Sequence, residues 1–201
     1  MENNQLPPNI KIWHLGLGFA NSNVIYSLIK SGVTEQLRDS SKSLVQLSSD
    51  CNLNSSILFR VLRFAIAIDV IVLTNNLYSL SDTGRFLLKD VPGSINGGMT
   101  LTGSDPWQKS WNNLLHSMHS GEPAFDTAMG SPFFDYLNDH PEYGEPYNKW
   151  MTTVSTMASK AITEAYDFST YKTICDIGGG HGMLLKGILS INPNLNGILY
   201  D

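Results

Sequence analysis

The chain has 201 residues, with 13 Lys and Arg against 18 Asp and Glu, and its formal net charge is −5. This acidic balance gives no electrostatic reason to expect binding to nucleic acid or to an anionic membrane surface. Its polar first residues predict no signal peptide, and no apolar run reaches the ~18 residues that a membrane-spanning helix needs.

The cysteine content indicates a reducing compartment. Cys51 and Cys175 are far apart in the sequence, and Cys175 falls inside an apolar segment with the character of a buried strand. Two buried thiols are therefore expected rather than a disulfide, and the predicted location is the cytoplasm.

The first ninety residues predict mainly helices followed by a hairpin. Residues 1–10 read as a flexible arm, and residues 11–31 carry apolar side chains at mainly helical spacing. Asn54 or Ser55 is expected to cap the helix that begins at residue 56. Residues 33–37 are predicted to form a short turn or helix, and residues 44–50 and 56–69 to form helices. The hairpin strands are predicted at 70–73 and 77–80, and a further short helix ends at Lys89.

Two helices followed by a hairpin are typical of a winged-helix domain, whose usual function is DNA binding. The helix that would enter the major groove, residues 56–69, carries only Arg60 and Arg63 as cations, and its other positions are mostly apolar. Such a helix is expected to bury its face, so we expect no nucleic-acid partner.

Residues 91–110 contain four glycines and two prolines and predict a linker. Helical spacing returns from Trp107 to His119. His116 and His119 have a spacing that can bind metal, but no Cys or acidic residue completes a ligand set, so no metal is predicted.

A short helix from Pro132 and a long helix over 143–166 follow. Tyr147, Met151 and Ser155 are four residues apart and lie on one stripe of the long helix. A core-facing stripe and a ligand-facing stripe both have this spacing.

The segment Ile174 to Gly182 contains the most informative pattern of the chain. A short apolar strand ends at Asp176, glycines follow at 178, 180 and 182, and a helix begins near Met183. A second strand, residues 197–200, ends on Asp201. This order is half of a nucleotide-binding βαβ unit, in which glycines let a ligand approach the backbone.

His181 lies between two of these glycines. A general-base role and a loop-filling role are both open to it, and the loop-filling role is favoured.

The spacing Asp-x-Gly-x-Gly-x-Gly differs from the dinucleotide fingerprint. It resembles motif I of class I S-adenosylmethionine (SAM) methyltransferases. With residues 44–84 and 111–151, it makes the chain similar to the small-molecule O-methyltransferase family, which includes caffeic acid and hydroxyindole O-methyltransferases. One departure is Asp69, where this family usually has a glycine at the entry to the wing.

This resemblance implies an α/β fold with three parts. Residues 1–90 would form a mainly α winged-helix-like dimerisation domain. Residues 91–170 would form a linker and helices lining the substrate and cofactor pocket, and residues 171–201 the first β-α-β of a Rossmann-like SAM-binding domain. The chain is expected to be the N-terminal part of a longer protein; a short natural protein is the alternative.

The resemblance also implies the site residues. Trp107 and Phe134 would contact the acceptor, and for Trp107 plain helix packing is an equal alternative. No catalytic residue is assigned, because the family's general base is expected beyond residue 201. The residues implied to bind SAM are Tyr147, Met151, Ser155, Asp176, Gly178, Gly180 and Asp201.

The implied function is transfer of a methyl group from SAM to a hydroxyl of a small aromatic acceptor by a homodimer, with these 201 residues inactive alone. Two alternatives remain open. One is a non-methylating SAM-binding relative such as a decarboxylase, hydroxylase or pericyclase. The other is a short non-catalytic dimerisation module.

Overall fold

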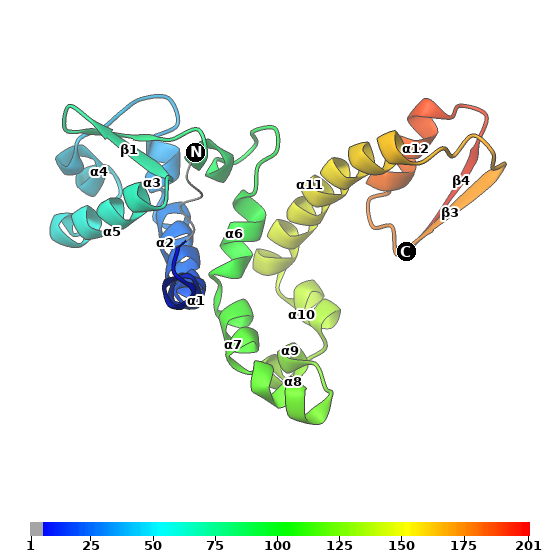
Figure 1. Ribbon diagram of the computed structural model, residues 1–201, viewed down its shortest axis with the longest axis horizontal. Helices are drawn as coiled ribbons and strands as arrows, with labels where there is room; N and C mark the ends of the chain where they lie inside the picture. The colour runs from blue at the N-terminus through cyan, green and yellow to red at the C-terminus, as the bar shows by residue number, and fades with distance from the viewer. Residues whose placement is uncertain (1–5) are drawn as a thin grey trace. The chain divides into compact units, whose positions relative to one another are not determined.

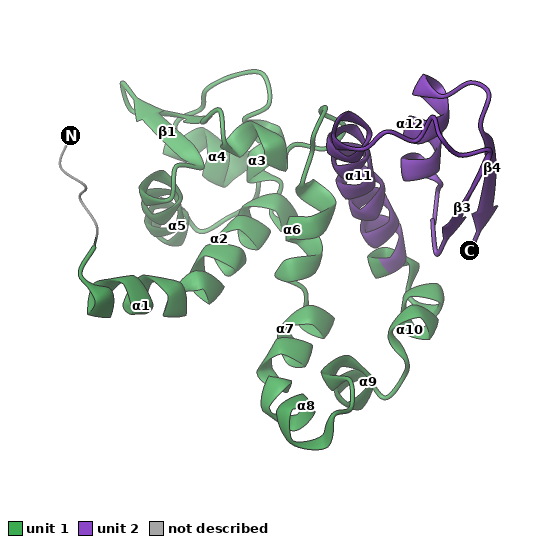
Figure 2. Cartoon of the chain, turned by 45° about the vertical axis from the view of Figure 1, so that its right-hand side comes forward, with its two compact units in different colours: residues 1–143 green, residues 144–201 purple. Residues whose placement is uncertain are grey.

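The computed structural model describes residues 6–201 and shows an α/β chain in which helices predominate (Figure 1). The chain divides into two compact units, one ending at Tyr143 and the other spanning Gly144–Asp201 (Figure 2). The first half of the arm expected over residues 1–10 lies outside the described residues. The second half is not an extended arm, because helix α1 (Pro8–Gly16) begins there with a proline, which suits the first turn of a helix.

Two helices of the first ninety residues begin at a capping side chain. Ser43 forms a capping box with Gln46 at the start of α4. The side chain of Asn54 accepts hydrogen bonds from the amides of Ser56 and Ile57, which confirms the predicted cap of α5. The bounds of these helices are α2 Gly18–Lys30, α3 Val33–Gln36, α4 Leu44–Asp50 and α5 Ser55–Ala67.

The predicted hairpin is present. Strand β1 (Ile71–Thr74) pairs in antiparallel fashion with β2 (Leu77–Leu80). Asn75 and Asn76 form the two-residue turn with φ angles of 51° and 62°, the left-handed values that a tight hairpin turn requires. A short 3-10 helix, η1 (Gly84–Leu87), follows.

A single apolar core joins these elements. Leu28 of α2, Leu47 of α4, Leu62 of α5 and Ile71 of β1 are all fully buried in it. The hydrophobic effect of burying these side chains holds the helices against the hairpin.

The chain leaves α5 through a left-handed residue. Asp69 has a φ of +57°, and the amide of Val70 donates to the carbonyl of Ala65 at 2.9 Å. The hydroxyl of Thr83 donates to Asp69 Oδ2 at 3.0 Å. An aspartate therefore occupies the position that a glycine usually fills at such a helix end.

The linker predicted over residues 91–110 is wrong in part, because α6 (Asn96–Thr102) lies within it. This helix packs against α2, and a Cβ built on Gly103, at the end of α6, would lie 2.2 Å from Tyr26 Cβ. The small residues of this segment thus serve close helix packing. The helices that follow are α7 Asp105–Asn112, α8 Leu114–Ser120, α9 Ala124–Met129 and α10 Phe133–Asp139.

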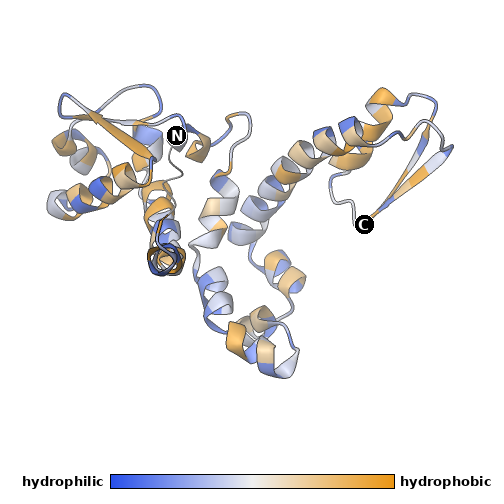
Figure 3. Cartoon of the chain, in the orientation of Figure 1, coloured by the Kyte–Doolittle hydropathy of each residue, from blue (hydrophilic) through white to orange (hydrophobic). Residues whose placement is uncertain are grey.

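The second unit contains most of the long helix α11 (Pro141–Ala165) and a β-α-β segment. Strands β3 (Thr173–Ile177) and β4 (Asn196–Tyr200) are parallel, with Asp176 opposite Leu199, and α12 (Met183–Ile191) connects them. In Figure 3 the apolar colour covers much of α12 and parts of both strands.

Cys175 lies in β3 and is exposed, so its predicted burial is wrong. The elements that pack on β3 in the described chain are β4 and α12, and they leave this side chain open to solvent. Cys51 is half-buried, and burial raises the pKa of its thiol.

Candidate functional site

The glycine loop, residues 178–182, connects β3 to α12. Gly178 and Gly180 have φ angles of 70° and 53°, and a Cβ built on either residue would meet no atom within 4 Å. A Cβ on Gly179 would instead lie 2.5 Å from Leu199 Cδ1 and 2.7 Å from the carboxyl carbon of Asp176. The backbone at Gly178 and Gly180 is therefore open, whereas Gly179 serves packing.

Three hydrogen bonds hold this loop. The amide of Gly178 donates to the carbonyl of Tyr200 at 2.8 Å, and that of Gly182 donates to Gly179 at 2.9 Å. The amide of Gly180 donates to Asp201 Oδ1 at 3.2 Å. The carboxylate at the end of β4 thus binds the loop itself, a contact that the sequence analysis missed.

Asp176 lies beneath the loop. Its Oδ2 is buried and has no hydrogen-bond partner within residues 6–201. A buried carboxylate oxygen without a donor is unfavourable, and a ligand that supplies a donor would remove this cost. This unpaired acceptor and the open backbone at Gly178 and Gly180 fit a small polar ligand such as the amino-acid part of SAM.

Helix α11 carries the other predicted cofactor residues. Tyr147 is half-buried and its pKa is raised by burial, so the phenol stays neutral and able to donate. Met151 is 37% exposed, and Ser155 is partly exposed. The stripe is therefore not a fully buried core stripe.

The glycine loop contacts α11 through His181. Its Nδ1 lies 2.8 Å from the hydroxyl oxygen of Thr152, which neighbours Met151 in the sequence. A second junction lies further along, where a Cβ on Gly187 of α12 would be 1.9 Å from Ser159 Oγ. Thr152 is not among the predicted site residues, because a threonine inside a helix carries no local signal of this contact.

The two predicted acceptor-binding residues belong to the other unit. The Trp107 ring lies edge-on to Phe125 and Phe133, at centroid distances of 6.0 and 5.5 Å. Phe134 packs edge-on against Phe133 at 5.0 Å and remains largely exposed. An aromatic cluster is thus present, and one of its rings is open to solvent.

His116, one of the two histidines with metal-binding spacing, has structural partners. The hydroxyls of Ser120 and Thr127 lie 3.2 and 3.1 Å from His116 Nε2. Within residues 6–201, no three His, Cys, Asp or Glu side chains are grouped so that they can hold a metal ion. None of the helices over the same residues has the length and apolar character needed to cross a membrane.

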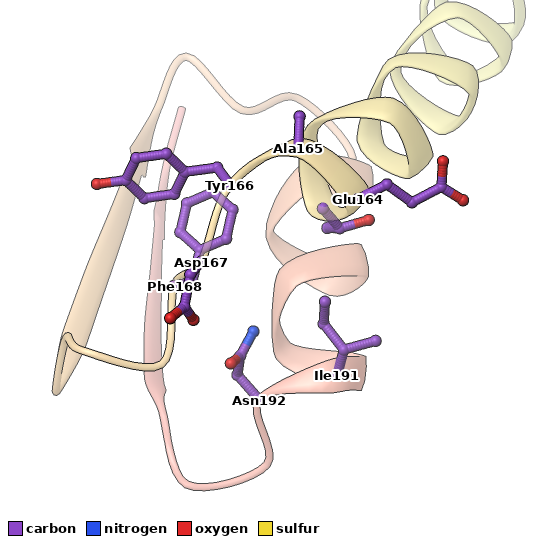
Figure 4. A pocket seen from close by; sticks show the side chains of 8 residues that line it. Glu164, Ala165, Tyr166, Asp167, Phe168, Ile191 and Asn192 are labelled. Carbon is purple, nitrogen blue, oxygen red and sulfur yellow. The ribbon is translucent and has the colours of Figure 1, made fainter.

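A cavity of about 390 Å³ lies in the second unit at the C-terminal ends of α11 and α12 (Figure 4). The glycine loop precedes the opposite, N-terminal end of α12, so the cavity is separate from the candidate site. The lining residues are Thr163, Glu164, Ala165, Tyr166, Asp167, Phe168, Ile191 and Asn192.

Comparison with known proteins identifies relatives along nearly the whole chain. Residues 111–201 match the sequence profile of the O-methyltransferase domain family. The phenazine O-methyltransferase PhzM of Lysobacter antibioticus is 30% identical over 185 residues, which are 92% of this chain and 54% of that protein. The O-demethylpuromycin-O-methyltransferase of Streptomyces alboniger is 29% identical over 95% of this chain and 51% of its own length.

The fold is shared with solved structures. The crystal structure of the protein LaPhzM superposes with a TM-score of 0.86 at 28% identity, covering 96% of this chain and 58% of that one. The present chain spans about half the length of the curated relatives it matches.

Proposed function

The chain belongs to the O-methyltransferase family, and from this premise we propose that its glycine loop binds SAM for methyl transfer to a hydroxyl of a small aromatic acceptor. One observation carries this proposal. The buried Oδ2 of Asp176 has no donor within residues 6–201, and it lies beside backbone that is open at Gly178 and Gly180.

Each residue of the loop has a distinct task in this proposal. Gly178 and Gly180 let the cofactor approach the backbone, and Asp176 accepts a hydrogen bond from its polar end. Asp201 uses Oδ1 to hold the amide of Gly180 and keeps its remaining acceptor capacity for ribose hydroxyls. The chemistry that SAM supplies when bound is an electrophilic methyl group on sulfur, so the protein chiefly aligns the reactants and removes one proton.

Tyr147, Met151 and Ser155 are proposed to contact the cofactor from α11. Trp107 and Phe134 are proposed to contact a flat acceptor ring, since aromatic side chains pack well against such rings. No residue between 6 and 201 is assigned the role of general base.

The family also supports a proposal for assembly. Residues 1–90 are proposed to be a winged-helix-like dimerisation domain, with α4, α5 and the β1–β2 hairpin as its winged-helix part. The side chains of Ile12, Trp13 and Leu15 in α1 and of Phe19 in α2 are each at least 64% exposed, an apolar surface that a second copy of the chain would cover. The cytoplasmic location stays a prediction.

Light scattering tests the dimer. The expected mass is twice the 22.2 kDa of the chain. Trp13→Glu is expected to give monomers, whereas Val45→Glu, at an exposed site on α4, leaves the dimer intact. A monomeric wild-type chain would overturn the assembly proposal.

Calorimetric titration with SAM tests the cofactor proposal. We expect saturable binding by the wild-type chain and no binding of NAD. A folded chain, as judged by circular dichroism, that binds no SAM would contradict the proposal.

Mass spectrometry of small phenols incubated with SAM and the protein containing this sequence tests the reaction. We expect an acceptor that gains the mass of one methyl group in place of a hydrogen. An acceptor that is transformed without this gain would identify a non-methylating relative instead.

A further inference from the structure

The imidazole of His181 makes the side-chain contact between the glycine loop and α11. Its Nδ1 lies 2.8 Å from Thr152 Oγ1, and its two sequence neighbours are glycines, which place no side chain of their own in this region. Its Nε2 makes no hydrogen bond to any of residues 6–201, and the side chain is exposed. One ring nitrogen is therefore engaged and the other is available.

The partners of Thr152 determine which nitrogen of His181 carries the proton. A threonine hydroxyl has one hydrogen and two lone pairs. Thr152 Oγ1 donates this hydrogen to the carbonyl of Asn148, 2.9 Å away in the preceding turn of α11. A hydroxyl that uses its hydrogen in this way can only accept towards His181. In that arrangement Nδ1 carries the hydrogen and Nε2 of the neutral ring is a bare acceptor.

The bond between His181 and Thr152 ties the glycine loop to α11, the helix that carries Tyr147, Met151 and Ser155. On its other side the loop is held by the bond from the amide of Gly180 to Asp201. Ser159 and Gly187 keep α11 packed on α12 independently of His181. Loss of the His181 bond is thus expected to release the loop without undocking the helix.

We propose that His181 is a positioning residue for the cofactor. Its Nδ1–H bond to Thr152 aligns the glycine loop with the cofactor-facing stripe of α11, and its Nε2 offers a hydrogen-bond acceptor beside the bound molecule. The cofactor part of this inference rests on the proposed function. The tautomer of His181 does not, because it follows from contacts within the chain.

Nuclear magnetic resonance of the histidine ring nitrogens tests the bond directly. In buffer alkaline enough to keep the ring neutral, we expect Nδ1 of His181 to appear protonated and Nε2 unprotonated. His181→Ala assigns the signal. Thr152→Val removes the acceptor and should shift the equilibrium towards the other tautomer, whereas Thr152→Ser retains it. A wild-type ring protonated on Nε2 would overturn the inference.

Titration with SAM tests the positioning role. We expect Thr152→Val and His181→Ala to weaken binding by about two- to tenfold, the range of one ordinary hydrogen bond. Thr152→Ser should bind as the wild type does. Thr153→Val is the matched control, because its hydroxyl bonds the carbonyl of Lys149 and does not touch the loop.

The outcomes separate the two proposals. A wild-type chain that binds no SAM overturns the proposed function, and with it the cofactor role of His181. A wild type that binds SAM while Thr152→Val binds equally well overturns the positioning role alone. Equal weakening by Thr152→Val and Thr153→Val also overturns it, because the effect would then belong to the helix rather than to the loop.

Discussion

Both units pair two short strands beside a helix, but they bury these strands to very different extents. In the first unit Ile71 of β1 is 2% exposed and Tyr78 of β2 is 4% exposed. In the second unit Ile177 of β3 and Tyr200 of β4 are 77% and 70% exposed. The β1–β2 hairpin is thus part of a hydrophobic core, whereas little of the described chain covers β3 and β4.

The two units also differ in the surroundings of their buried, unpaired oxygen atoms. Each contains one buried side-chain oxygen without a hydrogen-bond partner among the described residues, Thr34 Oγ1 in the first and Asp176 Oδ2 in the second. Thr34 is fully buried in a helical core. Asp176 lies under a glycine loop with open space above two of its residues. Only the second of these two oxygens therefore lies where our proposal places a ligand.

The largest expected effect comes from shortening an apolar side chain in a strand. Ile71→Ala should lower the free energy of unfolding by about 2–5 kcal/mol, because it leaves a cavity in a closed core. Ile198→Ala, at a residue of β4 that is 53% exposed, should lower it by less than about 1 kcal/mol. Urea unfolding followed by far-UV circular dichroism measures both, and equal losses would remove the contrast between the units.

The next largest effects are expected from substitutions at the two unpaired oxygens, those of Asp176 and Thr34. Asp176→Asn should weaken SAM binding about ten- to a hundredfold, because hydrogen bonds to charged groups contribute about 1.5–3 kcal/mol. Thr34→Val should leave SAM binding unchanged and raise stability by about 1 kcal/mol, since it removes an unsatisfied hydroxyl. Calorimetry and thermal unfolding check the pair. A loss of SAM affinity in Thr34→Val would show that the distinction is mistaken.

The glycines of the loop give a smaller, local contrast. Gly179→Ala should destabilise the second unit by about 1–3 kcal/mol through overpacking against Leu199. In Gly178→Ala the added methyl group meets no neighbour. This variant should lower the stability of the second unit by about 1–2 kcal/mol, because alanine is strained in the left-handed backbone conformation. Amide exchange of β3 and β4 reports both changes. Adding Leu199→Ala should rescue the Gly179 variant in part, because the contact with Asp176 remains, and should not rescue the Gly178 variant. Rescue of both variants would contradict the packing role.

The smallest expected effect is at the end of α5. Asp69→Gly should stabilise the first unit by about 0.5–1 kcal/mol, because glycine adopts the left-handed conformation without strain. Asp69→Ala keeps the strain and loses the bond from Thr83, so it should lower the melting temperature. If Asp69→Gly also lowers the melting temperature, the bond from Thr83 outweighs the strain.

Local chemistry explains which predictions from the sequence succeeded. The cap at Asn54 and the turn at Asn75-Asn76 depend on side chains that bond or bend their own backbone, so neighbouring residues suffice to identify them. The linker prediction failed at α6 because Gly103, read as a breaker, is instead used for contact with Tyr26.

The sequence by itself determined the order of the strands and of most helices and the glycine loop after Asp176, because these follow from spacing along the chain. Its motif residues also carry the resemblance to O-methyltransferases. Only the tertiary structure decided that Asp201 holds Gly180, that Thr152 meets His181 across 29 positions, and that Asp176 Oδ2 has no donor within residues 6–201. Such contacts depend on how distant backbone segments pack, and hydrogen bonding at a distance of about 3 Å leaves no periodic trace in the amino-acid order.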